Sequence, residues 1–145
     1  MKVFLLDANV LLALAWPNHP FHQRAVTRLA RSGSRRTTRW ATCLLTQAAF
    51  VRLSSNPAVI PGAKSPAEAG DMLAKLIHDP DHVFLEAKSR QMAGLQELLE
   101  RCHGPNQVND AFLIWLASCH RANLLTFDSP LRHLALKPEL VEVIA

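Results

Sequence analysis

Short apolar runs, each followed by a turn or a polar residue, alternate along this chain with longer segments of helical character. The first run, Lys2–Leu6, ends directly at Asp7. A continuous apolar run of about four to eight residues is typical of a strand that is buried on both faces of a parallel sheet. Further strands are predicted at Trp40–Cys43, His82–Leu85, Asn123–Phe127 and Leu140–Ile144.

The segments between these runs carry helix signals. Ser65 and Glu68 form a capping-box pattern with Pro66 at the first helical position. Helices are predicted at Ala8–Ala15, Asn18–Ala30, Thr46–Ser54, Pro66–Ile77 and Ser89–Cys102, then from Asn106 or Val108 to about Arg121, with a short one starting at Asp128. This alternation predicts a three-layer α/β/α fold with a mainly parallel central sheet of about five short strands. The 145 residues are expected to form a single domain, 1–145.

Composition narrows the class of protein. Hydrophobic residues make up 49% of the chain and charged residues 19%, which is typical of a globular protein. No stretch approaches the roughly 20 apolar residues of a membrane helix, and nothing resembles a secretory signal. The three cysteines, Cys43, Cys102 and Cys119, are widely spaced, which argues against a disulfide framework and a zinc knuckle. We therefore expect a cytoplasmic protein with no membrane partner.

The charge distribution is uneven. No Asp or Glu occurs between Ala8 and Ala67. The basic residues of this stretch are Arg24, Arg28, Arg31, Arg35, Arg36, Arg39, Arg52 and Lys64. Such a stretch forms either a solvated basic face or a surface for a polyanion or an acidic protein. The candidate RNA-binding residues are Arg24, Arg28, Arg35, Arg36, Arg39 and Arg52.

Three acidic residues lie where a ligand would bind such a sheet. Asp7 and Asp128 each follow a predicted strand directly, and ligands of parallel sheets bind outside the carboxyl ends of the strands. Asp110 lies in the first turn of the most apolar predicted helix. Taken singly, Asp7 and Asp128 could simply be helix N-caps, and Asp110 could complement the helix dipole. Their shared placement favours one site.

Three carboxylates that converge in a cleft repel one another unless a cation neutralises them. Because the acids are not joined by a Cys or His cluster, the expected ion is a hard one, Mg²⁺ or Mn²⁺. Such an ion polarises a phosphodiester and lowers the pKa of an attacking water. Together with the basic stretch, this indicates a metal-dependent nuclease.

Four segments resemble a known family in order and spacing. They are Leu5–Leu11, Leu45–Leu53 with the following Asn56-Pro57, Asn109–Leu113, and Leu125–Asp128. Together they span nearly the whole chain, and they are similar to the PIN-domain ribonucleases, specifically the VapC toxins of VapBC toxin–antitoxin modules. The resemblance implies Mg²⁺-dependent cleavage of RNA, inhibition by a cognate VapB-like antitoxin, and homodimers.

The resemblance also assigns residues. The family's metal ligands carry over onto Asp7 and Asp110, with Asp128 as a further acid, and Asn9 and Thr126 are expected to support them. One position departs from the family: Gln47 stands where its commonest pattern has Glu. Gln keeps an oxygen but loses the charge, so either weaker binding of a second metal or a purely positional role is expected.

Other interpretations stay open. A phosphatase of the haloacid dehalogenase type would need a second Asp where this chain has Asn9. Gln47 motivates a catalytically weakened RNA-binding module, and a PIN nuclease of RNA processing or decay would need no antitoxin. The tryptophans are expected in the core or an interface; Trp16, beside Pro17, is a candidate partner contact if it is exposed.

Overall fold

Five parallel strands form the centre of the molecule. The computed structural model describes residues 2–30, 37–87 and 92–145. The strands are β1 (Lys2–Leu6), β2 (Thr38–Thr42), β3 (His82–Phe84), β4 (Asn123–Thr126) and β5 (Val141–Val143). Their order in the sheet is β3-β2-β1-β4-β5, and every neighbouring pair is parallel. The predicted α/β fold with a parallel sheet of five short strands is confirmed.

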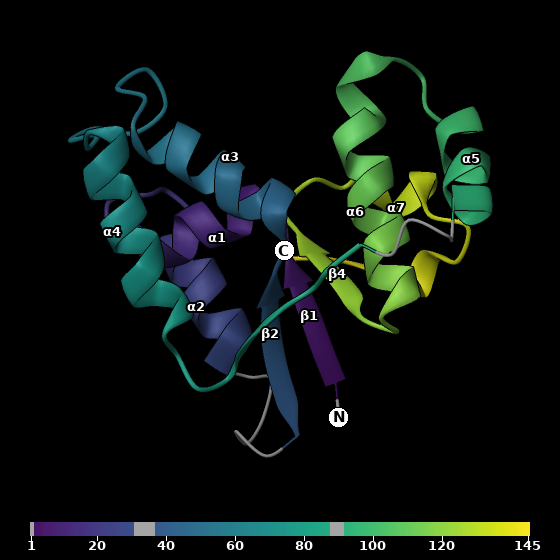
Figure 1. The fold of residues 1–145 in the computed structure, drawn as a ribbon, viewed down its shortest axis with the longest axis horizontal. Coiled ribbons are helices and arrows are strands. Elements are labelled where there is room, and N and C mark those ends of the chain that lie inside the picture. Colours follow the sequence, from purple (N-terminus) through teal and green to yellow (C-terminus); the bar gives the residue numbers. More distant parts are fainter. Residues whose placement is uncertain (1, 31–36, 88–91) are drawn as a thin grey trace.

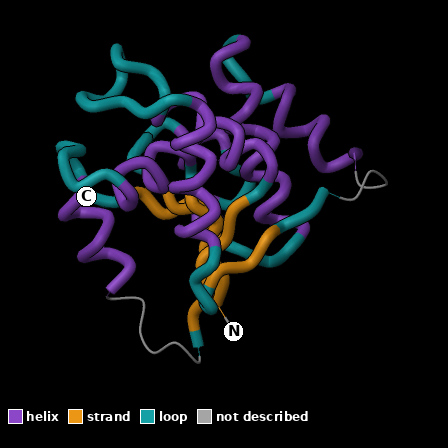
Figure 2. Tube along the Cα trace, turned by 60° about the vertical axis from the view of Figure 1, so that its left-hand side comes forward, coloured by secondary structure: helices purple, strands orange, loops and turns teal. Residues whose placement is uncertain are grey.

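Helices cover the sheet on both sides. In Figure 1, α1 to α4 lie to the left of the strands and α5 to α7 lie to the right. Figure 2 shows the strands gathered side by side, with helices packed around them. The helices are α1 (Ala8–Ala15), α2 (His22–Ala30), α3 (Leu44–Ser54), α4 (Pro66–Ile77), α5 (Met92–Glu100), α6 (Val108–Cys119) and α7 (Leu131–Leu134), with short 3-10 turns η2 (Pro105–Gln107) and η3 (Pro138–Leu140).

The apolar runs of the sequence divide between two cores. Phe4 and Leu6 of β1 belong to the core under α1, α3 and α4, whereas Leu5 belongs to the core under α5 and α6. Successive side chains of a strand point to opposite faces of the sheet. A strand that is covered on both faces has apolar side chains on both of them, which is why residues 3–6 of β1 form an unbroken apolar run.

Several helix boundaries differ from the sequence prediction. Helix α3 begins at Leu44 instead of Thr46, α7 begins at Leu131 instead of Asp128, and α5 and α6 end two residues early, at Glu100 and Cys119. The helix expected from Asn18 begins at His22, because His19 Nδ1 accepts from the backbone N–H of Phe21 at 3.0 Å and Asn18 donates to the carbonyl of Pro61 at 2.9 Å. These side-chain bonds give the segment an alternative to helical pairing. The helix expected from Ser89 begins at Met92 in the structure, and residues 88–91 lie outside the described residues.

Trp16 lies in the core and is not a surface contact. Its side chain is 7% exposed, and its indole N–H donates to the buried Ser54 hydroxyl at 3.0 Å. The condition under which Trp16 would contact a partner is therefore not met. Trp40 and Trp115 are buried as well. No helix within residues 2–30, 37–87 and 92–145 has the length and apolar character needed to cross a membrane.

Candidate active site

Both carboxylate oxygens of Asp7 accept hydrogen bonds, one from its own helix and one from a neighbouring strand. It follows β1, is only 8% exposed, and caps α1 through Oδ1, which accepts from the backbone N–H of Ala8 at 2.8 Å. Its other oxygen, Oδ2, accepts from the hydroxyl of Thr126 at 2.7 Å. One carboxylate oxygen thus orders the helix, and the other is held by the neighbouring strand β4.

Thr126 connects the ends of the two central strands. It is the last residue of β4, is fully buried, and lies beside Asp7 because Leu6 of β1 pairs with Leu125 of β4. Its hydroxyl donates to Asp7 and accepts from the backbone N–H of Asp128 at 3.0 Å. This one hydroxyl therefore orients the Asp7 carboxylate and fixes the chain at Asp128, whose own side chain is exposed.

Asp110 completes the group of acids. It lies in the first turn of α6 and is half-buried. Burial, together with the charges of Asp7 and Asp128, raises the pKa of Asp110 to about 6. Burial also raises the pKa of Asp7, against the opposing hydrogen bonds from Thr126 and Ala8, and Asp128 adds to that rise. Asp7, Asp110 and Asp128 thus lie within electrostatic reach of one another, at the ends of β1 and β4 and the start of α6.

The oxygen atoms of the acidic and amide side chains at the carboxyl ends of β1 and β4 suit a hard cation as ligands. Among the described residues, no three Asp, Glu, His or Cys side chains form a ready-made cluster around an ion. Mg²⁺ needs only one or two protein carboxylates and keeps several waters, so such a cluster is not required. Asn9 Oδ1 is buried two residues after Asp7 and has no hydrogen-bond partner in the described part of the chain. An unpaired buried oxygen costs about 1–3 kcal/mol, and a cation or a water would relieve that cost.

Gln47, on helix α3, is held by a hydrogen bond to a residue of the sheet. Its Nε2 donates to the Thr42 hydroxyl at 2.9 Å, and that hydroxyl lies 2.7 Å from His82 Nε2. Burial lowers the pKa of His82, which favours the neutral ring that can accept from Thr42. Gln47 is half-buried, so it is not simply a helix-surface residue, and its amide points to the end of β2. Sequence reasoning missed Thr42 and His82, because no motif links residues 40 positions apart.

The predicted RNA-binding arginines fall into different environments. Arg28 forms an ion pair with Glu142, with Nη2 to Oε2 at 2.7 Å, and lies over the ring of Phe4. Arg39 donates to Asp81 at 3.2 Å and to the carbonyl of Pro80 at 2.9 Å. Arg24, which lies over the Phe21 ring, and Arg52 are exposed. Arg35 and Arg36 lie outside the described residues.

Comparison with known proteins gives consistent matches over the whole chain. The PIN domain model matches residues 4–137. Ribonuclease VapC39 of Mycobacterium tuberculosis is 36% identical over 143 residues, covering 97% of this chain and 98% of that protein. Ribonuclease VapC44 of the same organism is 39% identical over 124 residues, covering 86% and 84% of the two chains.

Solved structures show the same fold. The crystal structure of VapBC2 from Rickettsia felis bound to a DNA fragment from their promoter superposes with a TM-score of 0.69 at 16% identity, covering 99% of this chain and 100% of the other. FitAcB from Neisseria gonorrhoeae superposes with a TM-score of 0.53 at 14% identity, covering 92% and 94%. The parallel fold, the sequence similarity to ribonucleases named VapC and the match of residues 4–137 to the PIN domain model agree. The chain belongs to the PIN-domain family, among its VapC proteins.

Proposed function

We propose that this chain is a Mg²⁺-dependent endoribonuclease and the toxin of a toxin–antitoxin module. The observation that carries the proposal is that Asp7 and Asp128 follow β1 and β4 while Asp110, at the start of α6, lies within electrostatic reach of both. Burial, and then the charges of Asp7 and Asp128, raises the pKa of Asp110 to about 6. Similarity to proteins named ribonuclease VapC supports RNA as the substrate. The direct test is cleavage of a structured RNA by purified protein with Mg²⁺, with Mn²⁺ and with a chelator.

The ion would be held by Asp7 and Asp110, with Asp128 as a further acidic ligand and Asn9 Oδ1 as a nearby oxygen. When bound, Mg²⁺ would lower the pKa of a water and stabilise the charge that develops on the phosphodiester. The residues of the chain would supply orientation. Thr126 holds Asp7 Oδ2, and the α1 N-terminus holds Oδ1, so the Asp7 side chain has little freedom to rotate.

Replacing Thr126 by Val is expected to lower kcat by roughly 10- to 100-fold, the usual effect of removing a hydrogen bond to a metal ligand. Val keeps the shape and burial of Thr but loses the hydroxyl that donates to Asp7. The variant should also need more Mg²⁺ for half-maximal cleavage, which a purely structural role would not cause. Thr126→Ser retains the hydroxyl and should restore both values; equal reductions in the two variants would contradict the positioning role.

The exposed arginines Arg24 and Arg52 are the best candidates to contact RNA phosphates, because Arg28 and Arg39 already have acidic partners in the chain. Replacing Arg24 and Arg52 together by Ala should weaken RNA binding. For a single-stranded RNA, the slope of log K against log salt should fall by about 0.7 for each phosphate that the variant no longer neutralises. Arg132→Ala, which replaces an exposed arginine on α7, is the matched control. An unchanged salt slope in the double variant would remove these residues from the RNA surface.

The proposed partners are a VapB-like antitoxin and a second copy of the chain, in the cytoplasm where RNA is available. The similarity to VapBC2 and FitAcB supports a protein partner. Co-expression with the product of a short reading frame beside the gene should give a stable complex that no longer cleaves RNA. Light scattering of the purified chain decides between a monomer and the proposed homodimer. Cleavage without any inhibitory partner would favour an RNA-processing nuclease instead.

Gln47 favours a second candidate function, an RNA-binding PIN module with weakened catalysis. Its amide nitrogen is engaged with Thr42, and it brings no negative charge to the site. The cleavage assay separates the two functions. Binding of RNA by well-folded, partner-free protein without any Mg²⁺-dependent cleavage would favour the binding module.

A further inference from the structure

A cleft with a volume of about 390 Å³ is lined by none of the three acids. It is bounded by α5, α6, η3 and the first residues of β4. Asn123, which begins β4, lines the cleft, whereas Thr126, which ends β4, holds Asp7. The cleft therefore opens toward the amino end of β4, and the acids lie at the carboxyl ends of the strands. Its size is within the usual range of small-molecule sites.

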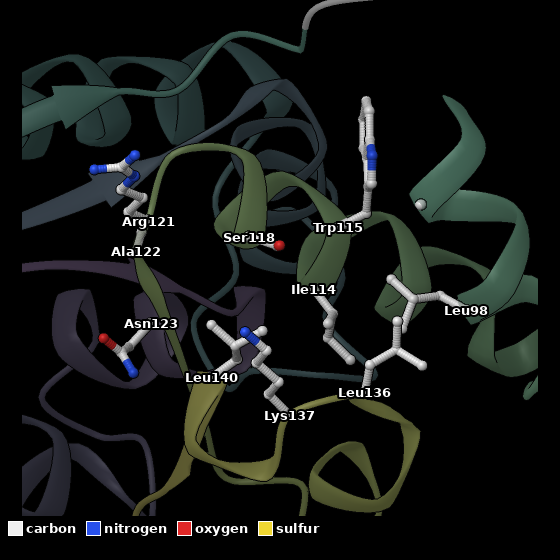
Figure 3. A pocket seen from close by; sticks show the side chains of 11 residues that line it. Leu98, Ile114, Trp115, Ser118, Arg121, Ala122, Asn123, Leu136, Lys137 and Leu140 are labelled. Carbon is white, nitrogen blue, oxygen red and sulfur yellow. The ribbon is translucent and has the colours of Figure 1, made fainter. Parts of the chain in front are cut away.

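The two ends of the cleft differ in chemistry. Figure 3 shows Leu98, Ile114 and Leu136 together on one side and Arg121 and Asn123 on the other, with the Arg121 guanidinium pointing away from the apolar side chains. Lys137 lies between them, and its amino group reaches across the cleft beside Leu140. Of the described residues that line the cleft, two are cationic and none is acidic. An apolar floor with a cationic end suits a ligand that has an apolar body and one negative charge.

Two further features leave the apolar end open. Gly94 lies inside α5, where a glycine destabilises a helix by roughly 1 kcal/mol relative to alanine. A Cβ at this position would meet only Trp115 Cδ1, at 3.8 Å, so close packing does not require the glycine. Its effect is to leave space beside Trp115. Leu136 is 47% exposed, so apolar surface at this end of the cleft is open to solvent.

We propose that this cleft binds a small amphipathic anion, with its apolar body against Leu98, Ile114 and Leu136 and its carboxylate or phosphate toward Lys137. Burial of the apolar body provides most of the affinity, because apolar surface gains free energy when it is removed from water. The Lys137 amino group determines which head group is accepted. This binding site is separate from the carboxylate site and does not depend on the proposed nuclease activity.

The test uses three probes with the same eight-carbon chain and different head charges: sodium octanoate, 1-octanol and octylammonium chloride. Calorimetry on the full chain should show saturable binding of octanoate at one site, with at least tenfold weaker binding of the other two. Amide NMR shifts should change at Gly94, Ser118 and Asn123 and not at Asp7. Equal affinity for all three probes, or shifts spread over the whole surface, would overturn the proposal.

Two variants test the two ends of the cleft separately. Lys137→Glu should reduce octanoate affinity at least tenfold and improve octylammonium binding, while Lys75→Glu, which changes an exposed lysine on α4, should alter neither. Gly94→Leu should fill the apolar end and weaken octanoate and octanol together. RNA cleavage should be unchanged in Lys137→Glu. Full octanoate affinity in Lys137→Glu would overturn the proposal even if Gly94→Leu does not fold.

Discussion

Replacing Asp7 or Asp110 by Asn is expected to reduce Mg²⁺-dependent RNA cleavage by more than about 100-fold, because loss of a ligand should exceed the effect of losing a hydrogen bond to one. Asn has the shape of Asp and is also a good N-cap, so α1 should remain capped at position 7. Each variant loses one negative charge at the site, and Asp7→Asn also loses the second oxygen that accepts from the Thr126 hydroxyl. Single-turnover cleavage of a structured RNA at saturating Mg²⁺ measures the reduction directly.

The matched control is Asp71→Asn, which removes an exposed carboxylate from α4 and should leave cleavage unchanged. Circular dichroism should show that all three variants are folded. Cleavage by Asp7→Asn or Asp110→Asn at the wild-type rate would contradict the site proposed at the ends of β1 and β4. The same result in Asp71→Asn as in the site variants would indicate a general effect of charge.

The second large effect concerns stability and pH. The pKa of Asp110 is raised to about 6 in the folded chain, above its ordinary value of 3.8. The folded state therefore binds the Asp110 proton more tightly than the unfolded state does. The stability linked to this proton is fully present below about pH 4 and is lost as pH rises through about 6. At pH 7.5 the burial of the ionised Asp110, together with its repulsion by Asp7 and Asp128, destabilises the metal-free chain, by at most about 3 kcal/mol and by less after solvent screening.

Asp110→Asn removes this repulsion, so the metal-free variant should be more stable than the wild type at pH 7.5 and no more stable at pH 4. Mg²⁺ should instead stabilise the wild type more than the variant. At about 100 times its dissociation constant, Mg²⁺ should raise the free energy of unfolding of the wild type by about 2.7 kcal/mol and that of the variant by much less. Urea unfolding at pH 4 and at pH 7.5, with and without Mg²⁺, measures the difference in stability between wild type and variant under each of the four conditions. A metal-free Asp110→Asn variant that is less stable than the wild type at pH 7.5 would contradict the electrostatic coupling.

Several parts of the fold were readable from local sequence alone. The unbroken apolar run before Asp7 predicted a strand covered on both faces, and the capping pattern of Ser65 and Glu68 predicted the start of α4, where the structure shows both reciprocal bonds. Helix ends were less accurate where side chains such as His19 bond to the backbone nearby. Such bonds compete with helix formation, and the hydrophobic periodicity of the sequence does not reveal them.

The sequence by itself determined the alternation of strands and helices and the position of an acid after β1 and after β4. Only the tertiary structure decided which distant residues meet. Thr126 reaches Asp7, Arg28 reaches Glu142 and Trp16 reaches Ser54 because of the strand order β3-β2-β1-β4-β5 and the packing of helices over it. The physical reason is that periodicity and capping are properties of neighbouring residues, whereas strand order depends on how all the buried faces pack at once. That packing placed Thr126 beside Asp7 and assigned Arg28 to an internal ion pair.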